Sequence, residues 1–324
     1  MSRDAMKRYR MAHTQGRELV ADPDKLVEND PLILSYHNGP VMSGDSILVY
    51  VIYYGNFTAS QRSVISDFLN SFQSHEVPSP SVADWWGLTV EYRDSKDEPV
   101  SEAVQLGGER SDSAYSRGKN LKIRDIEDLI LGQVRNRKLP TDHKGIYIVL
   151  TAHDVEVEDF CKNQCASHFA TKPLDATDGR PLVYAWAGNA LSQCPSRCVW
   201  PFAKAEYGPR TQQPLKPPNQ DAGIDGMIIN IAEMIAGAAT NPFNSGYYQG
   251  DAAAPLEAAT ACAGIFGEGA YPGEPGKLLV DQKSGASFNA HGIRDRKFML
   301  PALWNPLDLQ CTPPQSANNE KKNA

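Results

Sequence analysis

Glu233 is the residue whose surroundings most resemble those of a catalytic group. It is the only charged residue between Asp225 and Asp251, in an otherwise apolar stretch, and carboxylates are seldom buried without a partner. Residues 232–236, Ala-Glu-Met-Ile-Ala, have the register of the zinc-binding H-E-x-x-H helix with alanine in both histidine positions, and alanine cannot bind zinc. We therefore expect either a structural glutamate paired with an arginine or a backbone amide, or a hydrolase or inactive metallopeptidase-like scaffold centred on Glu233.

The cysteines offer a second kind of chemistry. There are six of them, and they stand at Cys161, Cys165, Cys194, Cys198, Cys262 and Cys311. The first four form two C-x3-C pairs, whose thiolates could bind zinc, although structural zinc sites usually have C-x2-C spacing. Disulfides are the leading interpretation, and zinc binding and buried free thiols are the alternatives, because the sequence does not select a pairing. Asn56-Phe57-Thr58 is a glycosylation sequon, which matters if the chain is secreted.

Three histidines are further candidates. His153, with Asp154 beside it, follows the strongest predicted strand, where α/β proteins commonly place functional groups. His168 and His291 are expected in polar loops, and no serine or cysteine stands at a known catalytic spacing from any of the three. Aromatic faces could also stack on sugar rings, although core packing is expected for most of the aromatic residues considered, which are Trp85, Trp86, Trp186, Trp200, Tyr247 and Tyr248.

Two common catalytic signatures are missing from the sequence. There is no G-x-S-x-G pentapeptide of a serine hydrolase. The glycine-rich segment 267–277 lacks the G-x4-G-K-[ST] spacing of a phosphate-binding loop and predicts an ordered loop instead. We therefore expect no enzymatic activity, no cofactor and no bound metal.

The composition excludes several kinds of partner. A net charge of -7 and a pI near 5.5 argue against a nucleic-acid-binding protein. No run of eighteen apolar residues occurs, which predicts no membrane span. Residues 1–30 are polar and charged without the apolar core of a signal peptide, and by themselves they indicate a cytosolic protein.

The hydrophobic pattern predicts an α/β fold with one domain. Thr58 and Gln61 form a capping box before a helix. Strands are expected at 32–36, paired through a turn with 47–55, and at 88–92, 145–152 and 182–188. Further helices are expected at 123–138, as a buried apolar element near 224–239, and at 255–263, with 93–120 as a polar loop. The arrangement predicts a mixed sheet flanked by helices and disulfide-stapled loops, with a disordered arm over 1–30, a domain over 31–312 and a polar tail over 313–324.

Several long segments resemble one family of plant proteins. They include NPFNSGYYQGDAAAPLEA within 224–258 and the double C-x3-C, and they recur in order over 36–55, 61–69, 145–161, 184–202, 224–258 and 284–306. The chain resembles the EXORDIUM family, also called the phosphate-induced protein 1 family.

The resemblance implies a secreted protein of the apoplast or cell wall. It is expected to take part in growth by cell expansion and in brassinosteroid and carbon or nutrient responses. The family has no established enzymatic activity, so the resemblance implies no catalytic residues and only adds weight to disulfides. A wall polysaccharide or another apoplastic protein is the expected partner. Members of the family begin with a signal peptide, whereas this sequence starts with a charged arm.

Overall fold

The computed structural model describes residues 32–314, apart from residues 75, 163, 206–212 and 253. The predicted arm over 1–30 and almost all of the predicted tail over 313–324 therefore lie outside the described residues. A single hydrophobic core extends through the described part of the chain, from Leu34 to Trp304. The limits of the predicted domain, 31 and 312, stay a prediction.

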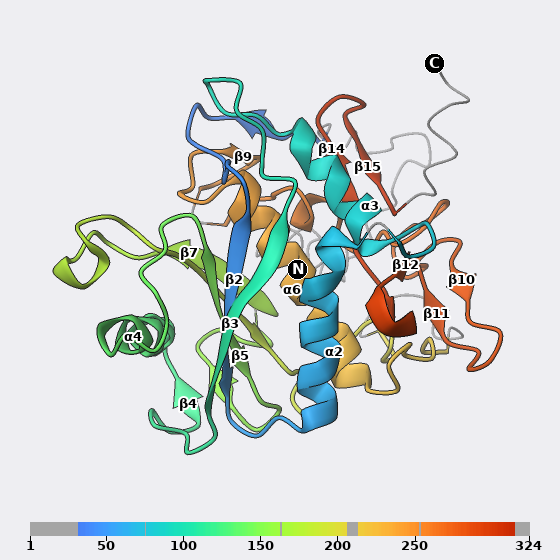
Figure 1. Ribbon diagram of the computed structural model, residues 1–324. Helices are drawn as coiled ribbons and strands as arrows, with labels where there is room; N and C mark the ends of the chain where they lie inside the picture. The colour runs from blue at the N-terminus through green and yellow to red at the C-terminus, as the bar shows by residue number, and fades with distance from the viewer. Residues whose placement is uncertain (1–31, 75, 163, 206–212, 253, 315–324) are drawn as a thin grey trace, which may run out of the picture.

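A five-stranded mixed sheet in the order β3-β2-β5-β8-β7 forms the centre of the molecule (Figure 1). The parallel strands are β2 (Ile47–Tyr54), β3 (Val104–Asp112), β5 (Ile146–Thr151) and β8 (Val183–Gly188), and β7 (Ala166–Ala170) closes one edge antiparallel to β8. Val51 of β2 lies between Glu109 and Ile148, which fixes the register. Every residue of β5 and β8 is buried, as expected for parallel strands covered on both faces.

Helices cover both faces of this sheet. Figure 1 shows α4 (Ile123–Arg135) on one face, and α2 (Ala59–Asn70) and α6 (Ala222–Thr240) on the other. The predicted capping box of α2 is present, because Thr58 Oγ1 accepts from Gln61 N at 3.2 Å and Gln61 Oε1 accepts from Thr58 N at 3.0 Å. Short helices are α3 (Val82–Gly87) and α5 (Pro195–Cys198).

The α6 helix is the predicted buried apolar element. Among the described residues it is the one helix long and apolar enough to cross a membrane, yet 94% of the relevant window is buried inside the protein. Its N-terminus is capped by Asp221, whose Oδ1 accepts from Ile224 N at 3.0 Å. Because neighbouring elements surround this helix, its apolar composition is that of a core helix.

Two-stranded ladders connect the remaining loops. They are β1 (Ser35–Tyr36) with β9 (Tyr247–Tyr248), β4 (Asn120–Leu121) with β6 (Glu156–Val157), β10 (Leu279–Val280) with β11 (Ser287–Phe288), β12 (Ala290–His291) with β13 (Lys297–Phe298), and β14 (Leu303–Asn305) with β15 (Gln310–Thr312). Short 3-10 helices are Ser71–Gln73, Leu88–Glu91, Asp175–Thr177, Thr260–Cys262 and Ile293–Asp295. The mixed sheet, the buried helix and the stapled loops agree with the predicted fold class.

Two predicted strand assignments were wrong. The segment 32–36 does not pair with 47–55, because β1 pairs with β9 while β2 has parallel partners on both sides. The segment 88–92 is mainly a 3-10 helix, Leu88–Glu91, that continues from α3, and Thr89 Oγ1 donates to Trp86 O at 2.7 Å in this turn. Its alternating apolar residues are equally compatible with a short helix packed on the core.

Two further assignments were also wrong. Residues 93–120 are not all loop, because they contain β3, an edge strand whose half-exposed polar residues hide its period. Residues 255–263 form only a 3-10 turn at Thr260–Cys262. Gln249 and Leu256 exchange two backbone hydrogen bonds, at 3.0 and 2.9 Å, which hold the start of that segment extended.

Candidate functional site

Glu233 lies on α6 with 7% of its surface exposed. Burial raises the pKa of this carboxyl above its usual range. Within the described part of the chain it has no hydrogen-bond or ion-pair partner, so the arginine or backbone amide expected from the sequence is not found there. A surface pocket of about 460 Å³ lies elsewhere, at the end of α2, and is lined by Asn70, Gln73, Ser74 and Glu76.

His168 is the candidate histidine with the most buried surroundings. It lies in β7 and not in the polar loop expected from the sequence. Its Nε2 is 2.9 Å from each carboxylate oxygen of Glu257, and both side chains are only 5% exposed. Since a carboxylate only accepts hydrogen bonds, Nε2 carries the proton. Asn241 Nδ2 also donates to Glu257 Oε1, at 2.7 Å.

Close approach of α6 makes this buried cluster possible. A Cβ at Gly237 would lie 2.8 Å from Glu257 Oε2 and 3.2 Å from His168 Nε2. A larger residue would therefore displace the carboxylate or the ring. Glu257 and Asn241 were not singled out from the sequence, because nothing in their local pattern connects them with His168. The cluster joins β7, α6 and the loop before Thr260, and it is enclosed.

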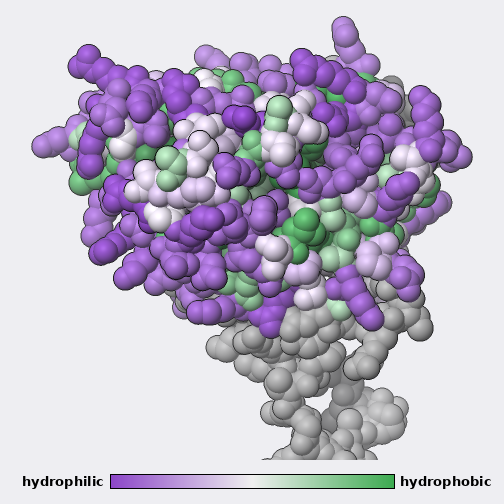
Figure 2. All heavy atoms as spheres, turned by 90° about the horizontal axis from the view of Figure 1, so that it is seen from below, coloured by the Kyte–Doolittle hydropathy of each residue, from purple (hydrophilic) through white to green (hydrophobic). Residues whose placement is uncertain are grey.

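His153 and Asp154 lie at the carboxyl end of β5, as the sequence predicts. Figure 2 looks onto this end of the molecule, where a small hydrophobic patch is surrounded by hydrophilic side chains. Ser192 Oγ donates to the backbone carbonyl of His153 at 2.7 Å and lies 3.4 Å from its Nδ1. The serine proton is therefore committed to a carbonyl, and His153 does not activate the hydroxyl as a nucleophile.

Asp154 is bonded to two side chains, those of Lys119 and Tyr115. Lys119 Nζ lies 2.5 Å from its Oδ2, and the Tyr115 hydroxyl donates to Oδ2 at 3.0 Å. The lysine, together with the tyrosine, lowers the pKa of the Asp154 carboxyl. Asp154 therefore acts as a charged anchor for two surface side chains and is not positioned to orient His153.

His291 lies in a short strand, and three of the tryptophans lie in the core. His291 lies in β12, where burial and then the nearby charge of Lys297 lower its pKa. Trp85, Trp86 and Trp186 are buried in the core, at 2%, 1% and 0% exposure, as expected for most of the aromatic residues. The three tryptophans therefore offer no face to a ligand.

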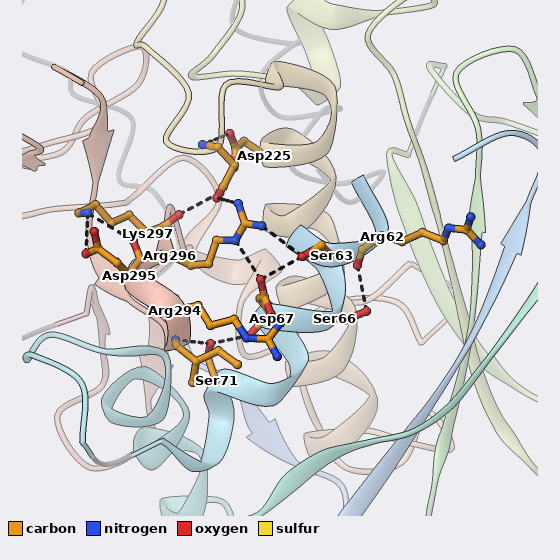
Figure 3. Close-up of polar contacts among 12 residues, drawn as sticks. Arg62, Ser63, Ser66, Asp67, Ser71, Asp225, Arg294, Asp295, Arg296 and Lys297 are labelled. Atoms are coloured by element: carbon orange, nitrogen blue, oxygen red, sulfur yellow. Dashed lines mark hydrogen bonds and ion pairs between the residues drawn. The ribbon is translucent and has the colours of Figure 1, made fainter. Parts of the chain in front are cut away.

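A polar network joins α2 and α6 to the loop between β12 and β13 (Figure 3). Asp67 is 3% exposed in its side chain and accepts from Arg294 Nη1 and Arg296 Nε, each at 3.0 Å. Arg296 continues the network by donating to Asn219 Oδ1 at 3.3 Å. Asn219 in turn donates to both carboxylate oxygens of Asp225, at 2.8 and 2.6 Å. These groups satisfy one another, so the network holds the loop against the two helices.

Asp225 is the carboxyl of this network whose pKa is shifted, because burial raises it to about 7. The unfolded chain has an aspartate pKa near 4, so this carboxyl stabilises the fold most below about pH 4, and the contribution is lost as pH rises to about 7. We expect the difference in unfolding free energy between wild type and Asp225→Asn to shift by up to about 4 kcal/mol across this range, in favour of the variant at higher pH. Urea unfolding at several pH values measures it, and a difference that is constant with pH would contradict the expectation.

Tyr247 and Tyr248 lie in β9, beside β1. The register pairs Tyr36 with Tyr247, and their rings stack with centroids 4.7 Å apart. His37 stacks on Tyr248 with a centroid distance of 3.7 Å and an interplanar angle of 11°. Tyr247 also meets the fully buried Tyr92 edge to face. Tyr36 and Tyr247 therefore connect to the core, whereas His37 is exposed and Tyr248 half-buried.

The six cysteines form three disulfides, which the sequence had not paired. Cys161 bonds to Cys194 and Cys165 to Cys198, so two parallel bridges join the same two segments. The third bridge joins Cys262 to Cys311. These sulfurs are bonded in pairs, and this contradicts the zinc and free-thiol alternatives. The sequon residue Asn56 is exposed, two residues after the end of β2.

Comparisons with known proteins all point to one family. A family model described as the phosphate-induced protein 1 conserved region matches residues 34–314. Protein EXORDIUM-like 2 of Arabidopsis thaliana is 45% identical over 292 residues, covering 88% of this chain and 91% of the relative. Protein PHOSPHATE-INDUCED 1 of Nicotiana tabacum is 44% identical over 290 residues, covering 88% and 89%.

A third relative extends the same comparison. Protein EXORDIUM of Arabidopsis thaliana is 44% identical over 292 residues, covering 86% of this chain and 88% of its own length. No solved structure matches the chain. Because the family model spans most of the chain and the relatives are identical at more than two fifths of the aligned residues, the chain belongs to the phosphate-induced protein 1 family, together with the EXORDIUM proteins.

Proposed function

We propose that this protein is a secreted, non-catalytic component of the plant apoplast or cell wall. It takes part in growth by cell expansion and in brassinosteroid and carbon or nutrient responses, and it acts by binding a wall polysaccharide or an apoplastic protein. Membership of the EXORDIUM family supports the role in growth. The observation that carries the extracellular location is the pairing of all six cysteines in disulfides, because such bonds persist in oxidising compartments.

The surface around Asn56 supports passage through the secretory pathway. Asn56 is exposed while Phe57 between it and Thr58 is buried, so a glycan on Asn56 would project into solvent. Thr58 is part of the sequon and also caps the N-terminus of α2. We propose that Asn56 carries an N-linked glycan.

The enzyme alternative has less support. A hydrolase centred on Glu233 needs a second carboxylate in reach and access for substrate. Glu233 is buried in α6, and among the described residues no carboxylate is bonded to it. At the carboxyl end of the sheet, Asp154 is paired with Lys119, and Ser192 donates its proton to the backbone carbonyl of His153.

Intact mass of the protein from its native tissue tests this proposal. Alkylation before reduction should add no label and alkylation after reduction should add six, one for each cysteine. Six labels before reduction would contradict the extracellular location.

Glycosidase treatment tests the glycan. Release of mass from wild type and from Thr58→Ser, but not from Asn56→Gln, is expected, because serine keeps both the sequon and the helix cap. Wild-type protein of unmodified mass at Asn56 would rule out the glycan.

A further inference from the structure

The short ladder of β1 and β9 presents two different faces. Side chains alternate between the faces of a strand, and the register places Tyr36 opposite Tyr247. These two rings lie on the face toward the buried Tyr92. His37, directly after β1, and Tyr248, in β9, stack on each other on the other face, which we call the His37–Tyr248 face. β9 lies near the upper end of the molecule in Figure 1, far from the start of α2.

The ring of His37 is held in a defined state. Its backbone amide donates to Gly246 O at 2.9 Å, and its Nδ1 lies 3.2 Å from the same oxygen. Because a carbonyl oxygen only accepts, Nδ1 carries the proton and Nε2 of the neutral ring is an acceptor. The exposed edge of the stacked pair therefore offers a hydrogen-bond acceptor beside an aromatic surface.

The hydroxyl of Tyr248 differs from those of the neighbouring tyrosines. The Tyr36 hydroxyl donates to Gly39 O at 2.8 Å, and the Tyr247 hydroxyl donates to Arg93 O at 2.8 Å. Within the described part of the chain the Tyr248 hydroxyl has no such partner, and its ring contact is the stack on His37. Tyr248 thus keeps a donor and acceptor for a ligand while its ring is fixed.

The two chain segments that form this face are themselves uncharged and polar. Segments 35–40 and 241–250 contain no Asp, Glu, Lys or Arg, although charged residues make up 22% of the chain. Asn38 and Asn244 are exposed in the turns on either side, both with left-handed backbone, at φ 64° and 55°. Amide and hydroxyl groups around a fixed aromatic surface suit a neutral ligand with flat apolar faces and hydroxyls at its edge.

We propose that the His37–Tyr248 face binds a neutral β-linked glucan chain. Such a sugar chain has axial C–H groups on its flat faces and hydroxyls around its edges, which matches a ring face bordered by hydrogen-bonding groups. An acidic polysaccharide would find no cation in either segment. The rings are already stacked before binding, so little side-chain freedom is lost on association. This inference rests on the proposed wall-binding function and names the ligand class and its site.

Calorimetric titration of the full chain with cellohexaose, and with a galacturonate hexamer for comparison, tests the proposal. We expect cellohexaose to bind in preference to the galacturonate, and Tyr248→Ala to weaken cellohexaose binding about tenfold or more. Tyr248→Phe keeps the ring and should lose less than Tyr248→Ala. Tyr271→Ala is the matched control, because that tyrosine is 58% exposed on a different loop and should bind as wild type does.

The outcomes separate this inference from the function on which it rests. The unfolding midpoint of Tyr248→Ala checks that this variant is folded. We expect it to fold, because backbone hydrogen bonds hold the β1–β9 ladder. Unchanged cellohexaose affinity in a folded Tyr248→Ala variant, or preference for the galacturonate, would overturn the glucan site, while retention of wild type on isolated walls would still support wall binding. If wild type binds neither isolated walls nor apoplastic protein extracts, the proposed function is overturned as well.

Discussion

His168→Leu should lower the free energy of unfolding by about 3–5 kcal/mol. The substitution removes the ring nitrogen that lies 2.9 Å from both oxygens of Glu257, inside a site where each side chain is 5% exposed. Among the described residues, the Glu257 carboxylate would then retain the hydrogen bond from the side-chain amide of Asn241. An incompletely paired carboxylate in the core is strongly destabilising because it has lost its solvation.

Two additional variants make this result specific to the pair. Glu257→Gln keeps an acceptor for Asn241 without a charge, and we expect it to cost less than His168→Leu. The double variant His168→Leu with Glu257→Leu should be more stable than His168→Leu alone, since no buried charge is left unpaired. Denaturant unfolding is measured for these variants and for Glu257→Leu alone, which completes the double-mutant cycle. Additive effects of the two leucine substitutions would show that the two side chains do not interact.

Removing both parallel disulfides should destabilise the protein by about 6 kcal/mol, and removing one should cost about 2.5 kcal/mol. Each bridge closes a loop of 33 residues. When one bridge remains, the other closes only a small ring, formed by the segments Cys161–Cys165 and Cys194–Cys198, so it restricts the unfolded chain less. The paired removal therefore exceeds the sum of the two single removals.

The Cys262–Cys311 bridge is the internal comparison. It spans 49 residues with no parallel bridge beside it, and its removal should cost about 4 kcal/mol. Cysteine-to-alanine pairs, Cys161 with Cys194, Cys165 with Cys198, and Cys262 with Cys311, are compared by guanidinium unfolding. If each of the first two pairs costs as much as the third, the two bridges restrict the unfolded chain independently, contrary to this expectation.

The candidate groups fall into two physical classes. His168, Asp67, Asp225 and Glu233 are buried, and the first three are bonded to other side chains of the fold. These bonds contribute to the stability of the fold. His37 and Tyr248 lie at the surface with groups free for a ligand. This distribution supports the proposal that the protein acts by binding, because catalysis needs reactive groups in contact with substrate.

Local pattern was sufficient for the elements with strong periodicity. The capping box at Thr58, the buried strands β5 and β8, and the apolar helix α6 were all predictable, since their signals lie within one helical turn or one run of residues. The family was also recognisable from strings of residues alone. The mixed sheet follows from alternating helices and strands.

Contacts between distant segments were decided only by the tertiary structure. The partner of β1 is 211 to 213 residues away in register, as Tyr36 with Tyr247 and Ser35 with Tyr248 show by subtraction of their numbers. The polar edge strand β3 and the disulfide pairing depend likewise on what the rest of the chain brings beside them.

The same distinction applies to the candidate residues. The sequence by itself identified Glu233 as an isolated charge in an apolar helix, and His153 and Asp154 as groups at a strand end. It could not show that His168 meets Glu257, or that His37 stacks on Tyr248. Residue type and spacing determine local conformation and chemical potential, whereas burial and partners depend on side chains that are far apart in the chain and are brought together by packing of the core.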